Sequence, residues 1–237
     1  MGAPARVCVV VPTYNEVDNA LPLLEAVKEV RIPDLALLFV DDSSPDGTTE
    51  VLRSAVARET WVRLIVRNAK LGIGSAYQAG FREAIDSLGA SILVEMDADL
   101  QHPPAAIPAL VRAINAGADV AVGSRYVPGG SVSGLSLWRR SVSKGANAFA
   151  RTVLGLPVRD STSGFRAYTR AAAEVVTGTV LPTKGFEFQV ASLHLLKTRM
   201  KMVEVPYAFA ARTAGKSKLG LSDMARFFFG VIRVAMG

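Results

Sequence analysis

Three oxygen-bearing side chains lie close together in the middle of the chain. Asp97 and Asp99 are two residues apart, and Gln101 follows at the same spacing. If the backbone there is extended, side chains two residues apart point to the same side, so the two carboxylates would share one cation. Carboxylate and amide oxygens favour Mg2+ or Mn2+ over zinc. The alternative is that both aspartates only cap the next helix or lie in a solvated turn.

The residues around these acids predict their place in the fold. Ile92–Met96 is an apolar, β-favouring run, typical of a parallel strand buried on both faces. Pro103 and Pro104 then end the strand and open a helix, because proline is tolerated in a helical first turn. The acids therefore follow the carboxyl end of a strand, the edge at which open α/β sheets bind ligands. His102 is expected to support the site or the helix start.

Further acids follow other predicted strands. Glu16 comes after the first strand, and Asp41 and Asp42 come directly after the second. In a parallel sheet these carboxylates converge on the edge that carries Asp97, and such crowding is costly without a cation or hydrogen-bond donors. A nucleoside diphosphate bound through a metal ion supplies both. The alternative is that some of these acids only cap helices, and Asp46 has the best position for that.

Strands and helices alternate along the first half of the chain. The apolar runs predict strands at Val7–Val11, Leu35–Val40, Val62–Val66, Ile92–Met96 and Asp119–Val122. The helices between them are predicted to start at Asp18, to span 48–57, to end near Ala84 and to span 105–116. This alternation predicts a doubly wound, mostly parallel α/β sheet. Gly72 and Gly74 follow the third strand rather than the first, which disfavours a dinucleotide-binding hydride-transfer enzyme.

The second half of the chain has a different composition. Pro128–Ser136 is rich in Gly and Ser, which is typical of a mobile loop that closes over a substrate. Arg125, Arg139 and Arg212 stand at a strand end, a helix start and a basic loop, where guanidinium groups grip phosphates bidentately. The later elements are predicted as a helix over 138–154, a strand that includes Ser163–Arg166, a helix over 186–200, a strand over 203–210 and a helix over 221–236.

Composition limits the class of partner. The 237 residues carry a net charge of +6 and a pI near 9.7, which fits an anionic partner. The basic residues are not interleaved with aromatic ones, so nucleic acid is disfavoured. Cys8 is the only cysteine and no internal disulfide forms, which is compatible with a reducing compartment. The sequence predicts neither a signal peptide nor a membrane-spanning run.

Several short motifs together carry a resemblance to a known family. They are Pro12–Glu16, Val40–Ser43, the Asp-Ala-Asp-Leu-Gln-His-Pro-Pro run from Asp97, Gly123–Tyr126, Ser163–Arg166, and Arg212-x-x-Gly-x-Ser217-Lys218. Along nearly the whole chain this set resembles the family 2 glycosyltransferases, in particular the branch of dolichol-phosphate and polyprenol-phosphate mannose synthases. The resemblance implies a single GT-A domain, with a nucleotide-binding half over 1–122, an acceptor-binding half over 123–220 and a terminal amphipathic helix over 221–237.

The resemblance also implies substrates and site residues. It implies that mannose moves from GDP-mannose to polyprenyl phosphate with inversion, and that Mg2+ or Mn2+ is the cofactor. Asp99, Arg125 and Arg212 are implied as catalytic, and Asp97, Asp99 and Gln101 as metal ligands. The implied substrate contacts are Pro12, Tyr14, Glu16, Val40 and one of Asp41 or Asp42 for the nucleoside, Ala98, Arg212, Ser217 and Lys218 for the donor, and Arg125, Arg139 and Ser143 for the lipid phosphate.

A lipid acceptor implies a membrane surface. The protein is expected to be cytoplasmic and peripheral at the cytoplasmic membrane face, with a possible membrane-anchoring protein partner, because the transmembrane helices of many family members are missing. The apolar face of the final helix would lie in the lipid interface or pack on the domain. The alternatives are a transferase that uses UDP-glucose, another UDP-sugar or a non-lipid acceptor, and a non-catalytic module that binds nucleotide or membrane.

Overall fold

One mixed sheet organises the protein. The computed structural model describes residues 6–134, 136–181, 185, 187–210 and 221–236. Seven strands form the sheet in the order β3-β2-β1-β4-β7-β5-β8, and all neighbours are parallel except β7, which is antiparallel to both β4 and β5. The strands are β1 (Val7–Thr13), β2 (Leu35–Asp41), β3 (Val62–Val66), β4 (Ile92–Glu95), β5 (Val120–Ser124), β7 (Arg166–Thr169) and β8 (Met202–Pro206). The predicted α/β fold with a mostly parallel sheet is confirmed.

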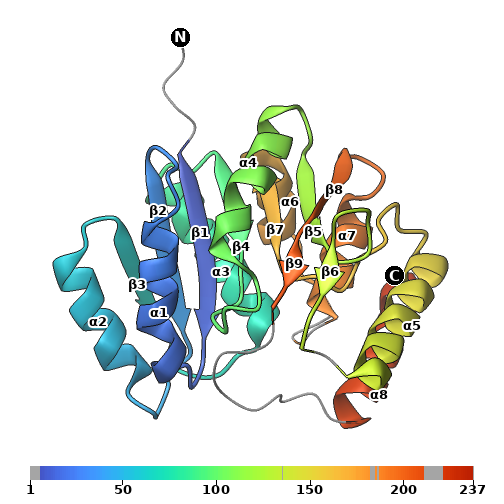
Figure 1. Cartoon of the computed structure of the whole chain (residues 1–237), viewed down its shortest axis with the longest axis horizontal. Coiled ribbons are helices and arrows are strands. Elements are labelled where there is room, and N and C mark those ends of the chain that lie inside the picture. The colour runs from blue at the N-terminus through green and yellow to red at the C-terminus, as the bar shows by residue number, and fades with distance from the viewer. Residues whose placement is uncertain (1–5, 135, 182–184, 186, 211–220, 237) are drawn as a thin grey trace.

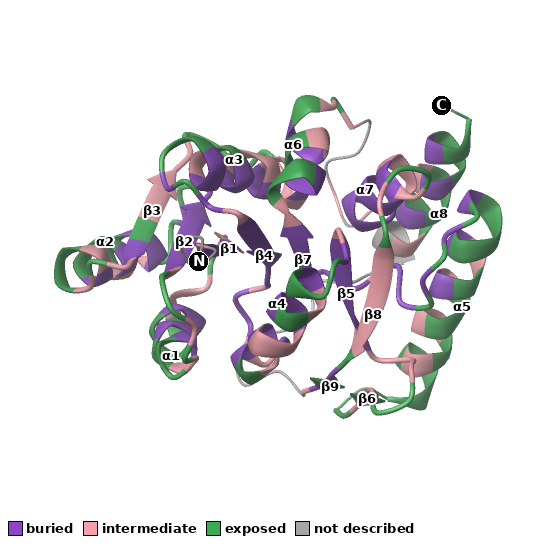
Figure 2. Ribbon diagram, turned by 90° about the horizontal axis from the view of Figure 1, so that it is seen from above, coloured by how far each residue is buried: buried purple, intermediate pink, exposed green. Residues whose placement is uncertain are grey.

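Helices cover both faces of this sheet (Figures 1 and 2). On one face lie α1 (Val17–Lys28), α2 (Thr48–Arg58) and α4 (Ile107–Asn115), the last preceded by a short 3-10 turn, η1 (Pro104–Ala106). On the other lie α3 (Ile73–Asp86), α6 (Arg170–Gly178) and α7 (Phe188–Leu196). Helices α5 (Leu137–Leu154) and α8 (Leu221–Ala235) extend this second layer.

The pattern of the strands explains this three-layer arrangement. In β1, Val7, Val9 and Val11 pack in one core, whereas Cys8 and Val10 pack in the other. Side chains of a strand alternate between the two faces, so a continuous apolar run requires cover on both sides. The β-α alternation supplies that cover through the crossover helices.

Some predicted boundaries were wrong. Helix α1 begins at Val17 with Glu16 at its N-cap, so Asp18 lies in the first turn and does not cap the helix. The segment predicted as a strand at Ser163–Arg166 becomes regular only at Arg166, where β7 pairs with β4 and β5. Helix α6 was not predicted from the sequence. Its buried residues nevertheless recur on one helical face, and the Thr169 hydroxyl accepts from the backbone N–H of Ala172 as an N-cap, so a local signal was present.

Part of the segment predicted as a mobile loop forms regular structure. It contains β6 (Ser131–Val132), which pairs in parallel with β9 (Ala208–Phe209). Ser133 reinforces the pair, because its N–H and its hydroxyl both donate to the carbonyl oxygen of Phe209. Within the described residues, no helix is both long enough and apolar enough to cross a membrane.

A close approach between α3 and the sheet generates a stability prediction. A Cβ atom on Gly80 would lie 2.3 Å from Val10 Cγ1 and 3.0 Å from Val40 Cγ2. We therefore expect Gly80→Ala to overpack the core and cost about 1–3 kcal/mol of unfolding free energy. Thermal melts would measure this. The control, Gly145→Ala on α5, meets no atom within 4 Å and should raise the melting temperature slightly. Equal melting temperatures for the two variants would contradict this packing.

Candidate nucleotide and metal site

The carboxylate of Asp41, at the carboxyl ends of β1 and β2, accepts hydrogen bonds at both of its oxygens. Asp41 is fully buried and accepts hydrogen bonds from the hydroxyls of Thr13, Ser44 and Thr49 and from the backbone N–H of Ser44. Burial alone would raise the pKa of Asp41, but these hydrogen bonds outweigh it and lower the pKa below its ordinary value. Four donors occupy the accepting capacity of one carboxylate. Asp41 therefore shapes the loop that bears Asp42.

Asp42 has a different partner. Its Oδ1 accepts from Arg67 Nε at 2.5 Å, and its Oδ2 accepts from the backbone N–H of Leu71 at 3.2 Å. Arg67 also donates to Ser75 Oγ and to the carbonyl oxygen of Gly72, so it ties β3 to the start of α3. Sequence reasoning missed Arg67, although its place directly after the third strand is a usable signal.

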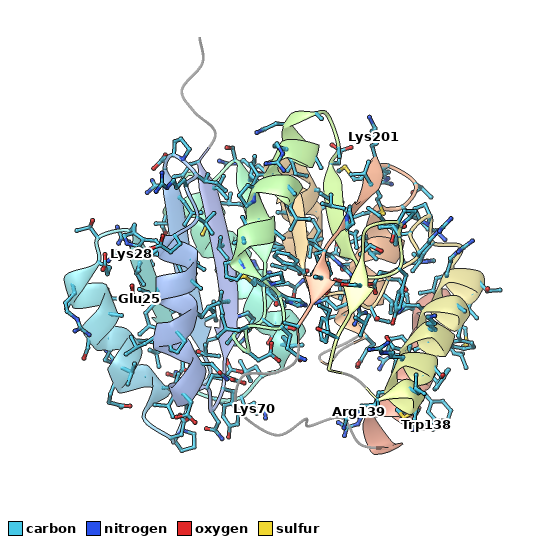
Figure 3. All side chains as sticks on the ribbon, viewed as in Figure 1. Glu25, Lys28, Lys70, Trp138, Arg139 and Lys201 are labelled. Atoms are coloured by element: carbon cyan, nitrogen blue, oxygen red, sulfur yellow. The ribbon has the colours of Figure 1, made fainter. Side chains whose placement is uncertain are left out.

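The other residues predicted to contact a nucleoside come from β1, from the loop that follows it and from the end of β2. The ammonium of Lys70 lies 4.0 Å from the centre of the Tyr14 ring, a cation–π contact that sequence reasoning did not predict. Glu16 accepts from the side-chain amide of Asn19. Pro12 is partly buried, whereas the side chain of Val40 is fully buried in the core against α3. Figure 3 places Lys70 at the edge of the molecule where β1 ends.

The predicted metal ligands lie in one loop after β4, but not in extended geometry. The chain turns at Ala98 and Asp99, and Leu100 has a φ of +61°. The expectation that extended backbone aligns Asp97 and Asp99 was therefore wrong. The loop folds back instead, and Asp99 Oδ1 accepts from the backbone N–H of Gln101 at 3.1 Å.

Each potential ligand is held by a bond to another part of the site. Tyr77 donates to Asp97 Oδ1 at 3.1 Å, and Gln101 Nε2 donates to the carbonyl oxygen of Ala210 at 3.3 Å. Two carboxylates and an amide oxygen in one loop form a hard oxygen donor set, which suits Mg2+ or Mn2+. The residues present therefore fit such an ion. Ala98 is buried between the two aspartates.

Buried polar groups lie directly behind this loop. Glu95 accepts from the Tyr168 hydroxyl, and Arg166, also fully buried, donates to Ser192 and to the carbonyl oxygens of Gln189 and Ser161. Burial raises the pKa of Glu95 to about 7, against the lowering effect of Arg166. Burial also lowers the pKa of His102 to about 4, so its imidazole is neutral at physiological pH.

Arg125 is held by a carboxylate rather than exposed. Its Nε and Nη2 donate to the two oxygens of Asp160 at 2.8 and 2.6 Å, and Nη2 also donates to Thr162. The guanidinium lies 5.2 Å from the centre of the Phe209 ring. Asp160 raises the pKa of Arg125 against the effect of burial, which keeps the guanidinium charged.

The remaining predicted residues are less tightly placed. Arg139 is exposed on the first turn of α5, and Ser143, one turn later, accepts from the Tyr126 hydroxyl at 2.8 Å. Arg212, Ser217 and Lys218 lie outside the described residues. The structure thus brings together the acids after β1, β2 and β4, and links Arg125 to Ser143 through Tyr126.

Comparison with solved structures defines the class of fold. Glucosyl-3-phosphoglycerate synthase from Mycobacterium tuberculosis, in complex with Mn2+, uridine diphosphate and glucosyl-3-phosphoglycerate, matches with a TM-score of 0.70 and 19% identity. The match covers 98% of this chain and 79% of that one. The GT-A fold expected from the sequence is therefore confirmed.

Sequence comparison defines the family. The model of glycosyl transferase family 2 matches residues 8–177, and the chain belongs to this family. Polyprenol monophosphomannose synthase of Mycolicibacterium smegmatis is 42% identical over 95% of this chain and 85% of its own length. Undecaprenyl-phosphate mannosyltransferase of Micrococcus luteus is 37% identical over 90% of this chain and 87% of its own. Dolichol-phosphate mannosyltransferase of Pyrococcus furiosus is 39% identical over 90% of this chain, which spans only 59% of that protein.

The buried Glu95 generates a pH prediction. The pKa of Glu95 in the folded state is raised from 4.5 to about 7. Between these two pH values the folded protein keeps a proton on Glu95 that the unfolded chain has released. Stability should therefore fall as pH rises from about 4.5 to about 7 and then level off. Glu95→Gln removes this titration, so we expect its melting temperature to fall less than that of the wild type between pH 5 and pH 7, measured in chelator.

A surface carboxylate provides the control. Glu174 is half exposed and pairs with Arg170 on α6, so Glu174→Gln should keep the wild-type pH dependence. Parallel stability curves for wild type and Glu95→Gln would contradict the assignment of this titration to Glu95.

Proposed function

We propose that this protein transfers mannose from GDP-mannose to a polyprenyl phosphate, with inversion at the sugar carbon. The observation that carries the proposal is the 42% identity to polyprenol monophosphomannose synthase over 95% of the chain. The site is consistent with it, because the acids proposed for a metal-bound nucleotide follow β2, β1 and β4, whereas Arg125, proposed for a second anion, follows β5 on the other side of β7 in the sheet order.

The donor is held at the ends of β1, β2 and β4 in this proposal. Pro12, Tyr14 and Glu16 contact the nucleoside. Of the two adjacent acids, Asp42 is proposed as the contact, because the carboxylate of Asp41 already accepts four hydrogen bonds within the protein. Asp97, Asp99 and Gln101 would hold Mg2+ or Mn2+. A bound ion supplies positive charge that stabilises the departing diphosphate. Arg212, Ser217 and Lys218 contact the donor phosphates.

The acceptor needs orientation more than deprotonation. A phosphate monoester has a second pKa of about 6, so it is already a nucleophilic anion near neutral pH. Within the described residues, Nε and Nη2 of Arg125 donate hydrogen bonds to Asp160 and Thr162. We therefore assign the contact with the acceptor phosphate to Nη1. Arg139 and Ser143 complete the anion site from α5. These positive groups offset the repulsion between two phosphorylated substrates.

A membrane surface is the source of this acceptor. Helices α5 and α8 lie side by side, and α8 buries Phe227, Val231 and Val234 against the domain while exposing 73% of Phe229. The first turn of α5 exposes 71% of Trp138 next to Arg139. Figure 3 shows both residues at the end of the molecule that also carries Lys70. Apolar and basic side chains in this arrangement suit an anionic lipid interface.

A transfer assay tests the proposed reaction. Purified protein with labelled GDP-mannose, Mg2+ and polyprenyl phosphate should form a lipid-soluble mannoside. Asp99→Asn removes one ligand charge and should lower turnover at least about 100-fold, at the upper end of supporting-residue effects. Asp86→Asn, exposed at the end of α3, is the control and should be fully active. Transfer from UDP-glucose but not from GDP-mannose, or nucleotide binding without any transfer, would overturn the proposal.

A flotation assay tests the membrane surface. Vesicles that contain anionic phospholipid should carry wild-type protein to the top of a density gradient. The double variant Trp138→Ala with Phe229→Ala should lose most of this binding, because about 0.8 kcal/mol is lost per buried CH2 group removed. Val180→Ala, which is 96% exposed outside α5 and α8, should float like wild type. Unchanged flotation of the double variant would exclude this surface.

A further inference from the structure

His102 makes a specific contact with the metal loop. It is 3% exposed, and its Nδ1 accepts a hydrogen bond from the backbone N–H of Asp97 at 3.1 Å. A ring nitrogen accepts only when it carries no proton, so the imidazole is neutral with its hydrogen on Nε2. The bond closes the Asp97–His102 loop, with a side chain at one end holding the backbone at the other.

The ring of His102 also packs against three aromatic rings from the second half of the chain. It stacks on Phe165 with a centroid distance of 5.2 Å and an interplanar angle of 10°. Tyr207 and Phe209 meet it edge-on at 5.9 and 6.3 Å. Phe165 directly precedes β7, and the other two rings lie at the end of β8 and in β9. The imidazole therefore joins the metal loop to β7, β8 and β9, and one of these rings, Phe209, also lies 5.2 Å from the Arg125 guanidinium.

The carboxylate of Asp97 is fixed from a second direction. Its Oδ1 accepts from the Tyr77 hydroxyl, and its Oδ2 lies 3.7 Å from His102 Nδ1. The hydroxyl comes from α3 and the imidazole from the loop itself. Asp99, Arg125 and Asp160 are the other charged groups whose fields act on the ring. The position of Asp97 thus depends on two neutral side chains that no proposed substrate contact involves.

We propose that His102 is a positioning residue for metal binding: it holds the backbone of Asp97, and thereby its carboxylate, in the position from which it would bind a divalent ion. This inference rests on the divalent metal ion of the proposed function, and it does not depend on which sugar or lipid the protein uses. Ligand geometry for Mg2+ is strict, and groups that orient a ligand typically contribute 10–100-fold to metal affinity. Because Tyr207 and Phe209 pack against the His102 ring, the position of Asp97 also depends on β8 and β9.

Two substitutions separate the hydrogen bond from the stacking. His102→Phe keeps a flat ring against Phe165 and removes the acceptor, whereas His102→Asn keeps an acceptor near the Nδ1 position and removes most of the ring. Mn2+ titration of each full-length variant, followed by electron paramagnetic resonance without substrate, measures metal affinity directly. We expect about 10–100-fold weaker Mn2+ binding for His102→Phe, and binding within about threefold of wild type for His102→Asn.

Steady-state kinetics adds a second readout. The apparent Mn2+ requirement of His102→Phe should rise, and saturating Mn2+ should restore much of its kcat. His194→Asn is the matched control, because His194 bonds to the carbonyl oxygen of Leu154 away from the loop. Wild-type Mn2+ affinity in His102→Phe, or equal losses in both His102 variants, would overturn the proposal. Normal Mn2+ binding with no mannosyl transfer in the wild type would instead overturn the proposed function alone.

A measurement on the unaltered His102 keeps the test valid if His102→Phe does not fold. The chain has only two histidines, so nitrogen-15 NMR of His194→Asn reports His102 alone. The inference requires an unprotonated Nδ1 and a protonated Nε2 at neutral pH. A protonated Nδ1 would overturn it, because such a ring cannot accept from Asp97.

Discussion

The need to place several carboxylates at one sheet edge, each with a partner, determines much of this structure. The charged carboxylate of Asp41 is stabilised by hydroxyl and amide donors, Asp42 is paired with Arg67, and Asp160 is paired with Arg125. Each partner comes from a different element, so the carboxylates also connect those elements. A buried charge without such a partner would cost several kcal/mol. The edge can therefore remain acidic without unfolding the domain, and the acids of the β4 loop remain suited to a cation.

A second consequence is that the two halves of the chain share one polar and aromatic interior. Strand β7 lies between β4 and β5 and runs against both, which brings Arg166 opposite Glu95. The Arg166 guanidinium reaches α7 and the 161–163 segment, and the rings around His102 connect β8 and β9 to the metal loop. The residues proposed to bind the donor and the acceptor are consequently positioned by the same packed core. In such a core, a shift on one side is transmitted to the other.

Much of the site was predictable because its residues follow strands, and strand ends converge in a parallel sheet. This reasoning placed Glu16, Asp42 and Asp97 at one edge, and the motif set identified the family that sequence comparison confirmed. It did not find Arg67, although that residue directly follows the third strand, and it did not find Asp160 or Tyr77, since isolated residues of these two types carry no local signal. It also described Arg125 as a phosphate ligand only, because the sequence cannot show that Asp160 occupies most of its guanidinium.

The sequence by itself determined the strand and helix types of the first half, the acid-bearing loops and the family. These follow from local periodicity and short motifs, in which each residue's role depends on near neighbours. Tertiary structure alone decided the antiparallel insertion of β7, the turn at Ala98 and Asp99 in place of extended backbone, and the partners of the buried charges described above. Those features depend on contacts between residues far apart in the chain, and a contact such as that between Glu95 and Tyr168 exists only after the sheet has assembled.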